Sequence, residues 1–140
     1  MIFPCERGAT LSFGYQYPLR VDTPSARRGG AKDRVARRTA IYASPIVACE
    51  LRFGARKKAS PRLSERVDAV LSAMEVLPLH APIDRIYADI RQHLAATGML
   101  IGPNDMLIAA HALTIEATLV TANVGEFSRV SGLSLENWLP

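Results

Sequence analysis

The chain has 140 residues, of which 49% are hydrophobic and 21% charged, and its net charge is +4. This length suits one domain with a real core, and no apolar run approaches the roughly 18 residues that a membrane span needs. The two cysteines, Cys5 and Cys49, have no CxxC spacing, and no apolar signal segment precedes them. The histidines lie too far apart in sequence for a local zinc motif. We therefore expect a soluble cytosolic protein without a disulfide framework or a zinc site.

The surplus of positive charge belongs to the N-terminal segment. Residues 1–40 hold eight basic and three acidic side chains, whereas the other hundred hold nine basic and ten acidic ones. Residues 1–33 are rich in Gly, Pro, Ser and Arg without periodicity, which is typical of a poorly ordered segment. We interpret them as a tail that binds nucleic acid, or as a solvated arm or a sequence not selected for folding. The folded domain is then predicted at residues 34–140.

Ordered structure is predicted to begin near residues 33–38, followed by a short buried strand over residues 40–43 and a helix over residues 45–57. Two more helices follow over residues 61–74 and 82–97, with a short strand over residues 76–79 between them. Each helix begins at a serine–proline pair or at a proline, which suits a helix N-terminus. Their apolar residues recur at helical spacing, so one face of each helix is expected in the core.

Glu50 lies on the apolar side of the first of these helices. Ile46 and Gly54, one turn before and after it, belong to the same face. A carboxylate there costs several kcal/mol unless it is paired, protonated or bound to a metal. An ion pair with Arg52 or Arg56 and a role in a functional site are therefore both open.

The sequence Gly102-Pro103-Asn104-Asp105 predicts a turn that leads into a core helix over residues 104–115, with Asn104 as its N-cap. Asp105 is then held in the first turn of a buried helix. A carboxylate in that place either complements the positive end of the helix dipole or serves a site. A continuous apolar strand over residues 117–121 follows, of the kind found in parallel sheets covered on both faces.

This order of elements predicts a three-layer α/β domain with a central parallel sheet flanked by helices. In such sheets, ligands bind beyond the carboxyl ends of the strands. Thr121, Asn123 and Glu126 lie at and just after such an end, and we expect them to meet Glu50 and Asp105 there. Carboxylate and amide oxygens suit Mg²⁺ or Mn²⁺, which usually serve phosphate chemistry.

Four ordered motifs resemble PIN-domain toxins of the VapC type: PIVACELRFG at residues 45–54, IGPNDMLIAAHA at 101–112, ATLVTANVGEF at 117–127 and LSLENWL at 133–139. The resemblance covers residues 34–139. It implies a PIN-like fold and a metal-dependent endoribonuclease that cleaves RNA, forms homodimers and is neutralised by a cognate antitoxin.

The same resemblance assigns roles to individual residues. Glu50 and Asp105 correspond to acids of the family's catalytic site, and we expect both to hold the metal. Asn123 and Glu126 correspond to further catalytic positions after the last predicted strand. The RNA substrate is expected to contact Thr121, Arg52, Arg56 and Lys57.

The resemblance is incomplete near the N-terminus. Members of the family begin with a buried strand that ends in Leu-Asp-Thr-Asn, and this Asp is a principal metal ligand. The nearest match is Val21-Asp22-Thr23-Pro24, which has no apolar run before it. A misassigned start or a frameshift upstream of about residue 34 would explain this departure. Two functions therefore stay open: an endoribonuclease of reduced activity, and a catalytically silent domain that only binds an antitoxin-like partner.

Overall fold

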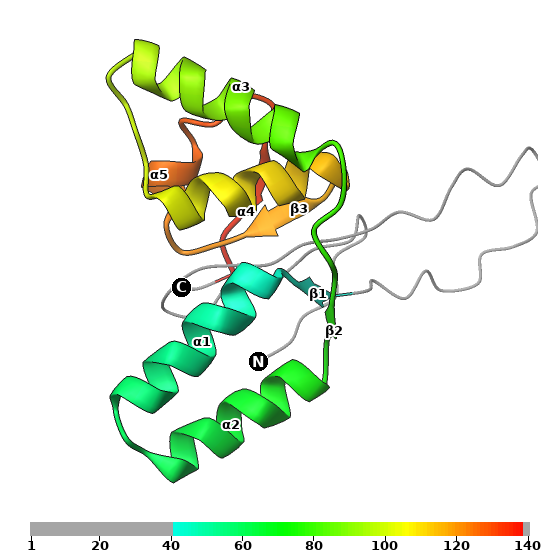
Figure 1. Ribbon diagram of the computed structural model, residues 1–140, viewed down its shortest axis with the longest axis vertical. Helices are drawn as coiled ribbons and strands as arrows, with labels where there is room; N and C mark the ends of the chain where they lie inside the picture. Colours follow the sequence, from blue (N-terminus) through cyan, green and yellow to red (C-terminus); the bar gives the residue numbers. More distant parts are fainter. Residues whose placement is uncertain (1–40, 139–140) are drawn as a thin grey trace, which may run out of the picture.

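The computed structural model describes residues 41–138, which form five helices and four short strands (Figure 1). In chain order these are β1 (Tyr42–Ala43), α1 (Pro45–Lys57), α2 (Pro61–Ser72), β2 (Glu75–Val76), α3 (Ile83–Ala96), α4 (Pro103–Thr114), β3 (Thr118–Val120), α5 (Val124–Phe127) and β4 (Ser134–Glu136). In Figure 1 α1 begins beside β1 and runs down to α2, and α3, α4, β3 and α5 lie above the β1–β2 pair. The predicted segment 1–33, with Asp22, lies outside the described residues.

The predicted helices α1 and α2 begin where the serine–proline pairs place them. Ser44 Oγ accepts the N–H of Ile46, and Ser60 Oγ accepts the N–H of Leu63, each at 3.3 Å. These bonds satisfy backbone donors that have no partner inside the helix. The two side chains therefore set the start of α1 and of α2.

The strands form two separate parallel pairs in the described part of the chain, β1 with β2 and β3 with β4. The α/β class is confirmed, but the expected central sheet is divided into these two pairs. The Leu77 N–H extends the first pair by donating to the Ala43 carbonyl at 3.0 Å. β1 ends at Ala43 and α1 begins at Pro45, so residues after Leu77 have no strand residue of β1 to pair with, and β2 is shorter than the predicted strand.

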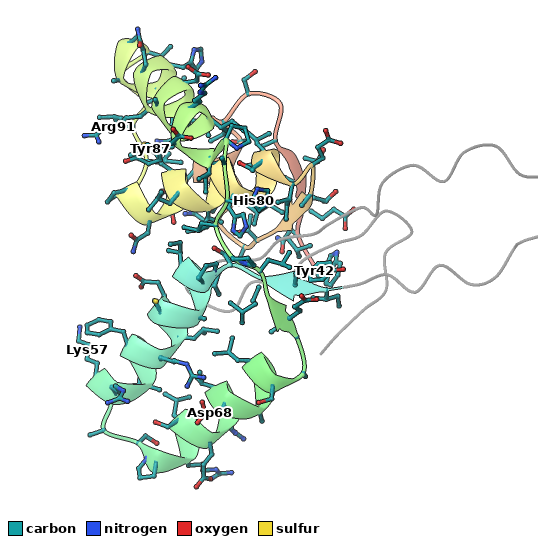
Figure 2. The ribbon with its side chains drawn as sticks, turned by 45° about the vertical axis from the view of Figure 1, so that its right-hand side comes forward. Tyr42, Lys57, Asp68, His80, Tyr87 and Arg91 are labelled. Carbon is teal, nitrogen blue, oxygen red and sulfur yellow. The ribbon has the colours of Figure 1, made fainter. Side chains whose placement is uncertain are left out.

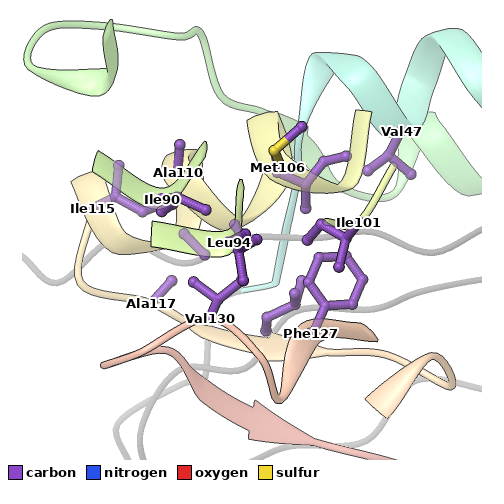
Figure 3. Packing of buried hydrophobic residues seen from close by; sticks show 14 residues of the cluster. Val47, Ile90, Leu94, Ile101, Met106, Ala110, Ile115, Ala117, Phe127 and Val130 are labelled. Atoms are coloured by element: carbon purple, nitrogen blue, oxygen red, sulfur yellow. The ribbon is translucent and has the colours of Figure 1, made fainter. Parts of the chain in front are cut away.

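Two buried apolar clusters hold the helices together. The larger one lies between α3, α4, β3 and α5 and also includes Val47 of α1 (Figure 3), and its fully buried members include Leu94, Ile108, Leu119 and Phe127. The smaller one joins β1, α1 and α2 and consists of Ala43, Ala55, Val67 and Leu71. Leu51 of α1 packs against both clusters. None of the helices within residues 41–138 is long and apolar enough to cross a membrane.

A buried polar pair ties α4 to the start of α1. His111 is 0% exposed, and its Nδ1 lies 3.3 Å from Ser44 Oγ. The Ser44 hydroxyl has two lone pairs and one proton, so its oxygen bonds to the imidazole and also accepts the Ile46 N–H. The pair therefore fixes the first turn of α1 against the core helix.

Candidate functional site

Asp105 lies in the first turn of α4, at the start of a helix whose later residues are mostly buried. The N-cap of this helix is Gly102, so the prediction of Asn104 as the cap is wrong. Pro103 occupies the first helical position, for which its fixed φ is suited and where its missing N–H costs nothing. Asn104 is thereby placed inside the helix, and its side chain is free to reach another element.

Asp105 contacts Glu126 of α5, and Asn123, the residue before α5, contacts the same carboxyl group. The pKa of Glu126 is lowered, first by its hydrogen bond with the Asp105 side chain, against the opposing effect of burial. The Asn123 side chain, the Gly102 backbone and the Arg129 cation lower it further. Two neighbouring carboxylates repel each other when both are ionised. A divalent cation would relieve this repulsion.

Thr121 supports this group of three residues from within the core. It is 1% exposed, and its Oγ1 accepts the Asn123 N–H at 3.0 Å. Its own N–H donates to the Glu136 carbonyl at 2.9 Å, which continues the pairing of β3 with β4. Thr121 thus shapes the turn that carries Asn123 to the end of β3. The direct contact of Thr121 with a substrate stays a prediction.

Glu50 joins the group through Asn104. The Asn104 Nδ2 donates to Glu50 Oε1 at 2.6 Å and so connects α4 with α1. The ion pair that the sequence left open for Glu50 is replaced by this bond, and Arg52 instead pairs with Asp68 of α2. The four predicted catalytic residues are therefore linked, by contact or by adjacency in the chain, around the N-terminus of α4. We call them the acidic group: Glu50, Asp105, Asn123 and Glu126.

The predicted substrate-binding cations lie along the α1–α2 hairpin, away from this group. Arg56 and Lys57 are exposed in the last turn of α1, and Lys57 lies at the end of α1 that points away from α4 (Figure 2). At 1.5 Å per residue, Arg56 lies roughly 9 Å along the helix from Glu50. A cavity of about 470 Å³ between α1 and α2 is lined by Arg52, Arg56 and Asp68, among others. The acidic group does not line this cavity.

The oxygen atoms of the acidic group suit a hard divalent cation. Mg²⁺ prefers oxygen ligands and is commonly held by one or two carboxylates together with substrate phosphates. The contact between Asp105 and Glu126 brings two such carboxyl groups together. Within residues 41–138, no three His, Cys, Asp or Glu side chains gather into a larger metal cluster. The group therefore fits a cation whose remaining ligands are water and substrate.

The sequence matches the PIN domain family over residues 23–133, from before α1 to the loop before β4. The chain belongs to this family. Ribonuclease VapC2 of Rickettsia felis is 40% identical over 105 residues, which cover 74% of this chain and 78% of that protein. The tRNA(fMet)-specific endonuclease VapC of Salmonella typhimurium is 36% identical over 96 residues, which cover 68% of this chain and 73% of that protein.

A solved structure agrees with this assignment to the PIN domain family. The crystal structure of VapBC2 from Rickettsia felis, bound to a DNA fragment from their promoter, contains a chain that superposes with a TM-score of 0.66. It is 40% identical, and the match covers 71% of this chain and 76% of that one. The resemblance to VapC-type PIN proteins, drawn from four sequence motifs, is thus confirmed. The family match begins within segment 1–33, which the sequence had placed outside the domain.

Sequence reasoning missed the role of Asn104 in this PIN domain. Asparagine is favoured at the N-cap, so Asn104 was assigned to the cap and not to a position inside the helix. The signal that points the other way is Pro103, since proline is favoured at the first helical position and so moves the cap to Gly102. The partner Glu50 is 54 positions away, and nothing in the local pattern indicates it.

Proposed function

We propose that this PIN domain is an endoribonuclease that depends on Mg²⁺ or Mn²⁺ and acts as the toxin of a VapC-type toxin–antitoxin pair. The observation that carries the proposal is the contact of Asp105 with Glu126, together with the bond that brings Glu50 to the same helix N-terminus. The printed names of its relatives, Ribonuclease VapC2 and tRNA(fMet)-specific endonuclease VapC, support RNA as the substrate.

In this proposal Asp105 and Glu50 hold the cation, and Glu126 and Asn123 orient the groups around it. When bound, the cation would offset charge on the phosphoryl oxygens and activate a water for in-line attack. The lowered pKa of Glu126 keeps its carboxylate ionised at neutral pH, so it attracts a cation or orients a water. The Asn123 side chain bonds to the same carboxylate and restricts its orientation.

The phosphate contacts of the proposed substrate come from the exposed cations of α1. Arg56 and Lys57 lie on the same helix as Glu50, so an RNA strand that follows α1 would reach the acidic group. Arg52 is paired with Asp68, but both side chains are more than half exposed. Exposed ion pairs contribute little to stability, so a phosphate can replace Asp68 at small cost.

Two protein partners belong to this proposal, a cognate antitoxin and a second copy of the chain. The support for an antitoxin is the similarity to a chain of the VapBC2 complex. Because the proposed substrate is RNA, we propose that the protein acts in the cytoplasm.

We further propose that the 140-residue chain turns over slowly. Residues 1–40 contain no apolar run that ends in the Asp expected from the family resemblance. With fewer carboxylates the cation is held less tightly, since Mg²⁺ gives up its water reluctantly. An apolar strand ending in Asp-Thr-Asn, placed ahead of residue 34, should raise the rate of RNA cleavage. Equal rates for the two chains would contradict this part of the proposal.

Cleavage of RNA in the presence of Mn²⁺ tests the proposed chemistry. Asp105→Asn should lower kcat/KM by about 100-fold, because the cation that would offset charge on the phosphoryl oxygens loses a carboxylate ligand. Asp84→Asn is a matched control, since Asp84 also lies in the first turn of a helix and its loss removes the same helix-dipole interaction. The proposal fails if Asp105→Asn cleaves RNA as fast as Asp84→Asn.

A further inference from the structure

We propose that Asn104 is a positioning residue, whose side-chain amide holds the Glu50 carboxylate of α1 at the same helix turn as Asp105. The inference rests on the proposed function and adds to it a residue that is itself uncharged. Its basis is the bond from Asn104 Nδ2 to Glu50 Oε1, at 2.6 Å.

This bond joins a neutral donor to an ionised acceptor. Hydrogen bonds to a carboxylate are shorter and stronger than those between neutral groups. The amide occupies one carboxylate oxygen and leaves the lone pairs of Oε2 for another ligand. An arginine or lysine in place of Asn104 would also hold Glu50, but it would offset the negative charge that attracts a cation. An asparagine therefore orients the carboxylate and preserves its charge.

The packing around α1 explains why such a bond is needed. α1 packs mainly against α2, and its contact with α4 is small. The buried pair of Ser44 and His111 fixes only the first turn of α1, and Glu50 lies more than one turn further along. Because Asn104 and Asp105 are consecutive in α4, the bond to Asn104 brings the carboxylate of α1 to the turn that carries Asp105.

Calorimetric titration with Mn²⁺ alone, on the full chain, tests this role. Asn104→Ala should weaken Mn²⁺ binding by about tenfold or more, as loss of a residue that orients a ligand commonly does. Asn104→Leu keeps a similar shape but lacks the donor and should weaken it similarly. Arg62→Ala is the matched control. Arg62 is the second residue of α2 and follows Pro61, just as Asn104 is the second residue of α4 and follows Pro103. It should bind Mn²⁺ like the unchanged chain.

A double-variant comparison separates positioning from a general effect on stability. If Asn104 acts through Glu50, Asn104→Ala should add nothing to the loss caused by Glu50→Gln. Thermal unfolding of Asn104→Ala should match that of Arg62→Ala within a few degrees. Additive losses overturn the inference, and so does unchanged Mn²⁺ binding in Asn104→Ala when Glu50→Gln binds more weakly.

A second measurement keeps the inference separate from the proposed function. The side-chain amide resonances of Asn104 should shift in Glu50→Gln and stay unchanged in Arg62→Ala. If neither Glu50→Gln nor Asp105→Asn weakens Mn²⁺ binding, the proposed metal site fails. In that case the amide resonances decide whether Asn104 holds Glu50, and unshifted resonances in Glu50→Gln overturn the contact.

Discussion

At the scale of single residues, the charge of His111 is determined by burial. Burial lowers its pKa from 6.5 to about 4, and the nearby His80 adds to the shift. Its Nε2 has no hydrogen-bond partner within the described residues. Protonation would therefore bury a charged imidazolium whose Nε2 has no partner among the described residues. The neutral form is thus the one that the fold accommodates.

The stability of the fold should therefore fall as the pH drops. Between about 6.5 and about 4 the unfolded chain binds a proton at His111 that the folded chain does not. The stabilisation is complete above the unfolded pKa and is lost as the pH falls toward the folded one. From neutral pH to about pH 4 the loss amounts to roughly 3 kcal/mol.

Urea unfolding at neutral pH and at about pH 4, for the unchanged chain and for His111→Gln, measures this loss of stability. The difference between the two chains isolates His111 from the acidic residues that titrate in the same range. If the free energy of unfolding depends on pH equally in the two chains, protonation of His111 is not the cause of the loss.

At the scale of elements, the N-caps of α1 and α2 offer a matched pair. Ser44→Ala and Ser60→Ala each remove a capping hydroxyl, which costs about 1 kcal/mol. Ser44→Ala also leaves the buried imidazole of His111 without its partner, which adds about 1 to 3 kcal/mol. We therefore expect Ser44→Ala to lower the free energy of unfolding more than Ser60→Ala. Denaturant titration with equal m-values checks this, and equal losses would contradict a role for the His111 bond.

Within the described residues, the four longer helices and the strands β1, β2 and β3 were predictable from sequence to within a few residues, whereas α5 and β4 were not. Proline and serine mark where α1 and α2 begin, and the apolar spacing shows which face is buried. The strands have two or three residues each, too few to show a period of two, so β1 to β3 were located from their apolar runs alone. The pairing of β4 with β3 could not be expected, because a parallel partner is chosen by the crossover and not by the strand itself.

At the scale of the whole molecule, the two clusters differ in size. The larger holds fully buried Leu, Ile and Phe side chains, whereas two of the four residues in the smaller are alanines. Local unfolding is easiest where few apolar side chains are buried. Native-state hydrogen exchange should therefore show the amides of α1 and α2 opening at a lower free energy than those of α3 and α4. Uniform protection across the four helices would contradict this expectation.

A substitution in each cluster extends the same prediction. Leu94→Ala, in the larger cluster, should destabilise the molecule by roughly 2 to 5 kcal/mol. Leu71→Ala, in the smaller one, should mainly increase exchange in α1 and α2 and leave α3 and α4 protected. Equal loss of protection in all four helices after Leu71→Ala would show that the two clusters unfold together.

The sequence by itself determined the four longer helices and the α/β class, because caps, prolines and apolar spacing act within a few residues along the chain. Its resemblance to known proteins in four motifs indicated the PIN domain family. The sequence also identified Asp105 and Glu50 as carboxylates in apolar helices. Only the tertiary structure decided that Asp105 contacts Glu126 and that Asn104, not an arginine, is the partner of Glu50. Such contacts join residues far apart in the chain. Which of several acceptors a side chain reaches is set by how α1, α4 and α5 pack.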